Sequence, residues 1–178
     1  MADQQFTVIP TSYHHHLFRS RLEARWAVYF DALGIRWQYE PEGYRFQDGT
    51  CYLVDFWLPQ VKMFAEVKPN DDLTRVVLNP EAEYKAAELA LALRLPVIIC
   101  DGLPRPTNYW AIWPMTDDPP FAPGWEWIDV YLDTEYLHEQ RFYMSCGGQD
   151  FPWHEEPENT WRSPELISAC LKAASWRF

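Results

Sequence analysis

The chain has 178 residues, of which 48% are hydrophobic and 17% are aromatic. A chain of this length and apolar content can bury a substantial core, which excludes an intrinsically disordered protein. The formal net charge of -11 excludes a surface coated in basic charge that binds nucleic acid nonspecifically, although it leaves room for a local basic patch.

The first half of the chain predicts one helix followed by several strands. Apolar residues recur at helical spacing over Arg19–Leu33, with Ser20 as the N-cap and Gly34 where a helix is expected to end. The predicted strands are Ile35–Glu40, Tyr44–Phe46, Tyr52–Leu58 and Met63–Lys68. The second and third should pair around the Asp48-Gly49 turn, because Asp-Gly between apolar runs is typical of a hairpin.

The second half predicts two more helices and three strands. A proline at the first helical position of Asn79-Pro80-Glu81 indicates a helix that continues to about Arg94. The later elements are strands at Pro96–Cys100, Tyr109–Trp113 and Glu126–Leu132, and a helix from Ser163 to about Trp176. This order predicts an α/β (α+β) fold with a mixed central sheet flanked by helices. We divide it into a core, residues 1–105, and an acidic, aromatic-rich C-terminal extension packed on it, residues 106–178.

The negative charge is concentrated near the end of the chain. The stretch 117–158 holds 11 acidic residues and only one basic residue, Arg141, so it should repel a phosphate backbone or bind a protein partner. The four cysteines form no CxxC pair, and a zinc site from Cys146, His154 and Cys170 would match no common spacing. Together with the lack of a secretory leader or a membrane-length apolar run, this predicts a soluble, cytoplasmic protein without a membrane partner.

Two apolar strands carry charged residues that a core would normally exclude. A loop at residues 59–62 would join them into a hairpin. Its register then pairs Leu58 with Met63, Trp57 with Phe64, Phe56 with Ala65 and Asp55 with Glu66. Opposed residues have Cβ atoms about 4.5–5.5 Å apart, so the carboxylates of Asp55 and Glu66 should repel each other unless a cation lies between them. Mg²⁺ or Mn²⁺ suits such oxygen ligands.

Strand alternation places Lys68 on the same face as Glu66. The lysine would then stand beside the ion, where it can hold an attacking water or stabilise charge on a phosphate. The backbone carbonyl of Val67, between the two, can complete the coordination. The alternative interpretation is a surface cluster of cross-strand charges, since an isolated D…ExK pattern is common by chance.

Glu23 is a further candidate on the first predicted helix. It lies at the border of the buried face, which would suit a role at a metal site. It also forms a capping box with Ser20, in which its carboxylate would only close the helix N-terminus. The residues alone leave both interpretations open.

Three segments together resemble a known group of enzymes. FRSRLEARWAVYFDALGIRWQYEPEGYRF, YLVDFWLP and FAEVKP look like the PD-(D/E)XK nuclease superfamily, especially small phage, plasmid and bacterial members akin to Holliday-junction resolvases and a transposon endonuclease subunit. The resemblance covers about residues 17–100. It implies a restriction-endonuclease-like core in which Asp55 and Glu66 bind the metal, Lys68 assists water attack and Glu23 holds or orients the metal-bound water. Val54 stands where many members have proline.

The implied activity is metal-dependent hydrolysis of phosphodiester bonds by a phage- or mobile-element-associated endonuclease acting on DNA. The expected cofactor is Mg²⁺ or Mn²⁺, and resolvase-like relatives suggest a homodimer. The expected contacts to DNA come from Arg19, Arg21, Lys62 and Lys85. The alternative is a catalytically silent protein of nuclease fold, whose acidic surface binds a protein partner or mimics DNA.

Overall fold

The computed structural model describes residues 9–69, 80–106, 109–114, 125–131, 143–145 and 163–178, with the backbone alone for 125–131 and 143–145. Its helices are α1 (Arg21–Ala32), α2 (Pro80–Leu93) and α4 (Pro164–Ser175). Its strands are β1 (Thr11–Tyr13), β2 (His16–Phe18), β3 (Gln38–Tyr39), β4 (Gly43–Arg45), β5 (Cys51–Leu53), β6 (Phe56–Leu58), β7 (Met63–Lys68), β8 (Val97–Asp101), β9 (Tyr109–Pro114), β10 (Trp125–Tyr131) and β11 (Tyr143–Ser145). None of these helices is long and apolar enough to cross a bilayer.

Seven of the described strands form one mixed sheet, in the order β11-β10-β9-β8-β7-β6-β3. β7 and β8 pair in parallel, which requires a crossover, and α2 lies in the chain between them. The other pairs in this sheet are antiparallel. The predicted α+β fold with a mixed central sheet flanked by helices is therefore confirmed.

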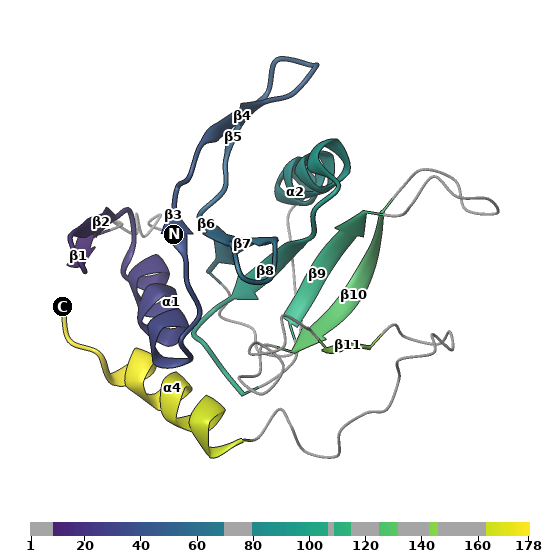
Figure 1. Cartoon of the computed structure of the whole chain (residues 1–178). Coiled ribbons are helices and arrows are strands. Elements are labelled where there is room, and N and C mark those ends of the chain that lie inside the picture. The colour runs from purple at the N-terminus through teal and green to yellow at the C-terminus, as the bar shows by residue number, and fades with distance from the viewer. Residues whose placement is uncertain (1–8, 70–79, 107–108, 115–124, 132–142, 146–162) are drawn as a thin grey trace, which may run out of the picture.

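The sheet separates two apolar clusters, because successive residues of its strands point to opposite faces. On β7, Met63, Ala65 and Val67 pack into the cluster that contains α1 and α4, whereas Phe64 packs into the cluster that contains α2. Figure 1 shows α1 and α4 together on one side of the sheet and α2 on the other. The residues that continue the Phe64 face of β7 are Glu66 and Lys68, so this face changes from apolar to charged along the strand.

The predicted strand at Tyr52–Leu58 is wrong in one respect, because it consists of two strands in different sheets. β5 pairs with β4 in a separate two-stranded hairpin, and β6 joins the main sheet beside β7. The chain leaves the main ladder at Val54 and Asp55. Figure 1 shows the β4–β5 hairpin extending away from the sheet.

A second difference is the β1–β2 hairpin, which is absent from the predicted elements. Its two-residue turn is formed by His14 and His15, both with positive φ. Such turns usually contain glycine or asparagine, so the sequence carries no ordinary signal for this hairpin.

The two halves of the predicted division share one sheet. β9 pairs with β8 across the boundary at residue 105. Near the end of the chain, α4 packs on α1, and the Arg25 guanidinium donates a hydrogen bond of 3.0 Å to the Ala174 carbonyl.

Candidate active site

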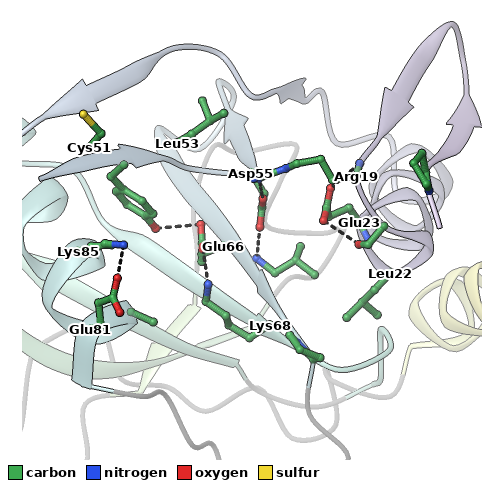
Figure 2. Close-up of a pocket in the computed structure, with 16 residues that line it drawn as sticks. Arg19, Leu22, Glu23, Cys51, Leu53, Asp55, Glu66, Lys68, Glu81 and Lys85 are labelled. Carbon is green, nitrogen blue, oxygen red and sulfur yellow. Dashed lines mark hydrogen bonds and ion pairs between the residues drawn. The ribbon is translucent and has the colours of Figure 1, made fainter. Parts of the chain in front are cut away.

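Asp55 lies where the chain crosses from β5 into β6. The predicted pairs from Leu58–Met63 to Phe56–Ala65 are confirmed, but the ladder ends there and does not include the predicted pair of Asp55 with Glu66. Instead, the Asp55 side chain takes the place of a backbone partner, because its Oδ2 accepts a 2.8 Å hydrogen bond from the Val67 N–H. The carboxylate is thereby directed toward the peptide of Val67; Figure 2 draws this hydrogen bond as a dashed line from Asp55.

Glu66 points into the same pocket from β7. Its Oε1 lies 2.6 Å from the Lys68 Nζ, and its Oε2 accepts a 2.9 Å hydrogen bond from the Tyr52 hydroxyl. Glu66 and Lys68 therefore share one strand face, as alternation predicts. Asp55 and Glu66 are only 4% and 6% exposed, so the structure places two buried carboxylates and one ammonium group at a single pocket wall.

The charge of Glu66 affects the ionisation of Asp55. Burial raises the pKa of Asp55 to about 8, and the negative charge of Glu66 contributes to the rise, while the Val67 N–H opposes it. A buried carboxylate beside a second one resists ionisation because the low dielectric strengthens their repulsion. Such a pair is a place where added positive charge is strongly favoured.

Arg19 supplies one such charge. Its Nη2 lies 2.8 Å from Asp55 Oδ1, and its Nε lies 2.6 Å from Glu40 Oε1. The guanidinium thus bridges Asp55 and Glu40, the residue that follows β3, although the Arg19 side chain is 55% exposed. Arg19 was expected to contact DNA, and the structure brings it into direct contact with a predicted metal ligand.

Glu23 closes the N-terminus of α1 and also reaches the site wall. Its amide donates to the Ser20 hydroxyl, and that hydroxyl lies 2.7 Å from Glu23 Oε1, so the predicted cap is confirmed. Its Oε2 accepts hydrogen bonds from the Tyr39 hydroxyl at 2.6 Å and from the Arg19 N–H at 3.2 Å. Glu23 is buried and lines the same pocket as Asp55 and Glu66.

The pocket has a volume of about 1010 Å³ and runs between the N-terminus of α1, β5, the end of β7 and the first turns of α2 (Figure 2). Of the basic residues expected to bind DNA, Arg19 and Lys85 line it. The exposed Arg21 begins α1 outside the pocket lining. Lys62 lies at the opposite end of β7 from Lys68, so the structure does not bring it to this pocket.

The oxygen atoms at this wall fit a small, hard divalent cation. Asp55 and Glu66 supply carboxylates, and the Val67 carbonyl leaves the strand on the same side as the Val67 N–H that binds Asp55. Within the described ranges, no three His, Cys, Asp or Glu side chains form a group that could hold a metal ion. An ion here would therefore depend on two carboxylates, the peptide carbonyl and water, and Mg²⁺ usually keeps several waters.

Three residues at this site were missed by sequence reasoning. Tyr52 and Tyr39 donate their hydroxyls to Glu66 and Glu23, and Glu40 pairs with Arg19. Their partners lie 14 to 21 residues away in sequence, and no local motif indicates such pairs.

Other predictions fall outside the described residues. Most of the acidic stretch 117–158 does so, apart from the backbone of β10 and β11, and so do Cys146 and His154 of the disfavoured zinc site. Comparison of the chain with protein-family models, with curated proteins and with solved structures gives no match. The geometry of the pocket is therefore the basis for a functional proposal.

Proposed function

We propose that this protein is a metal-dependent endonuclease that hydrolyses phosphodiester bonds in DNA, with a core of the restriction-endonuclease-like type. The observation that carries the proposal is the pair of buried carboxylates, Asp55 and Glu66, at one pocket wall with the Lys68 ammonium 2.6 Å from Glu66. Burying two like charges is costly, and a fold retains such an arrangement mainly where a cation or a reaction uses it.

Each residue has a role that follows from its contacts. Asp55, Glu66 and the Val67 carbonyl would hold Mg²⁺ or Mn²⁺, with Glu23 acting through water. When bound, the ion would lower the pKa of a coordinated water and neutralise charge on the phosphate. Lys68, held beside Glu66, orients the water and stabilises the negative charge that develops on the phosphate.

The basic side chains at the pocket suit the approach of DNA. Arg19 is half exposed and pairs with Asp55 through Nη2, so an ion at Asp55 would leave that nitrogen available for a phosphate group. Lys85 lines the pocket from α2, and Arg21 lies exposed at the start of α1. The three cysteines in the described residues are free thiols, which agrees with a reducing, cytoplasmic setting for the reaction.

The test is a cleavage assay with Mg²⁺ or Mn²⁺ over a panel of duplex, branched and single-stranded DNA, with RNA for comparison. We expect Asp55→Asn and Lys68→Ala each to reduce cleavage about 100-fold or more, because each removes a group that acts on the reacting centre. Lys172→Ala, which removes an exposed lysine on α4, is the matched control and should retain activity. Circular dichroism would verify that all variants are folded.

Undiminished cleavage by both site variants would refute the assignment of the residues. A folded wild-type protein that cleaves nothing in the panel would favour a second function, a nuclease-fold protein without catalysis that binds a protein partner. One observation favours this alternative: Asp55 and Glu66 each already have a cationic partner, Arg19 and Lys68 respectively, without a metal.

A further inference from the structure

Tyr52 reaches the proposed metal site from an element outside the main sheet. It lies in the middle of β5, its side chain is buried, and its hydroxyl donates a 2.9 Å hydrogen bond to Glu66 Oε2. The other oxygen of Glu66 is held by Lys68. The carboxylate is thus fixed at both oxygens, by a neutral donor on one side and a cation on the other.

The two donors act differently on Glu66. Lys68 belongs to the same strand and is 31% exposed, so its flexible side chain alone defines the carboxylate orientation weakly. The Tyr52 phenol is rigid and packed among apolar residues of the α2 cluster. The phenol hydroxyl has one O–H donor, and in the folded protein it is directed at Glu66.

The β4–β5 hairpin that carries Tyr52 is itself attached to α2. The Tyr84 hydroxyl donates a 3.1 Å hydrogen bond to Asp48 Oδ2 at the hairpin turn, and the rings of Phe46 and Tyr84 meet edge to face. The position of the Tyr52 hydroxyl is therefore set by packing of the hairpin against α2, independently of Lys68.

We propose that Tyr52 is a positioning residue of the metal site, which holds Glu66 in the orientation that binds the divalent cation. The inference rests on the proposed function, because it assigns a role in the same site. Partners that orient metal-binding side chains typically contribute about 10- to 100-fold in metal affinity or activity.

The deciding variant is Tyr52→Phe, which keeps the ring and removes only the hydroxyl. Tyr44→Phe is a closely matched control, because Tyr44 is the cross-strand partner of Tyr52 and donates its hydroxyl to Glu42, away from the pocket. The measurements are the affinity for Mn²⁺ by calorimetry, the thermal unfolding temperature without metal, and kcat and KM for the best DNA substrate.

We expect Tyr52→Phe to bind Mn²⁺ about 10-fold more weakly or worse and to lower kcat, with KM for DNA little changed, while Tyr44→Phe matches the wild type. Equal Mn²⁺ affinity in wild type and Tyr52→Phe would overturn the positioning role and leave the proposed function intact. Equal weakening in both variants would also overturn it, by indicating a general effect of the hairpin. A folded wild type that binds no Mn²⁺ would overturn the proposed function and this role together.

Discussion

The surroundings of Asp55 in the folded protein oppose the ionisation of its carboxyl group. The side chain is almost fully buried and faces the charge of Glu66, and these two factors raise its pKa to about 8. An aspartate in an unfolded chain ionises near pH 3.9. Because the folded protein binds this proton more tightly, the contribution of Asp55 to stability is fully present below about pH 4 and is lost as the pH rises to about 8.

Asp55→Asn should therefore change the pH dependence of stability. Asparagine resembles the protonated acid and cannot ionise, so the free energy of unfolding of the wild type should fall relative to that of the variant between pH 5 and pH 9. Urea denaturation across this range measures the difference. Mg²⁺ added near pH 9 should restore wild-type stability and leave Asp55→Asn unchanged, whereas parallel stability curves would show that Asp55 ionises normally.

The sequence predicts those features of this site that depend on neighbouring residues, and it does not predict the contacts between distant ones. Strand alternation and hairpin register depend on neighbouring residues, and they correctly place Glu66 and Lys68 on one face. Alternation along a single strand Tyr52–Leu58 would put Tyr52 and Asp55 on opposite faces. Because the strand is interrupted at Val54, both side chains line the same pocket. Only the tertiary structure reveals the hydrogen bond from Tyr52 to Glu66.

Among the elements, α1 carries a residue, Glu23, that both takes part in the helix N-cap and lines the pocket of the proposed site. The Ser20 hydroxyl caps the helix by accepting a hydrogen bond from the Glu23 N–H, and it donates one to the Glu23 carboxylate, which also lines the pocket. The cap was predictable from the spacing of serine and glutamate. The bond from Tyr39 to the same carboxylate was not, because it joins α1 to β3.

Two variants separate these roles. Ser20→Ala should destabilise the protein by about 1 kcal/mol, the usual cost of a lost N-cap, with little effect on cleavage. Glu23→Gln should cost similar stability and also lower cleavage about 10-fold or more, because it removes charge from the site. Denaturation and cleavage assays measured side by side test this. If both variants lose only stability, Glu23 serves the helix cap alone.

For the molecule as a whole, the net charge of -11 works against binding DNA. Attraction must come from a few cations near the pocket, of which Arg19, Arg21 and Lys85 are the candidates. We therefore expect weak binding to plain duplex DNA at physiological salt, with better binding to a structured DNA end or in the presence of a protein partner.

Salt titrations test this expectation. Three phosphate contacts give a slope of about -3 for the logarithm of affinity against the logarithm of salt concentration. Arg21→Ala should make that slope shallower by about 1, and Lys172→Ala should leave it unchanged. Tight, unaided binding to plain duplex DNA at physiological salt would contradict the expectation.

The contact between α4 and α1 has a consequence for how the protein is made. α1 is synthesised well before α4, yet the side chains of the two helices share one core, and Arg25 bonds to Ala174, 149 residues later. Pairings of such long sequence separation form slowly. α4 must therefore emerge from the ribosome before this part of the apolar surface is covered, and until then the exposed surface makes the nascent chain prone to aggregation.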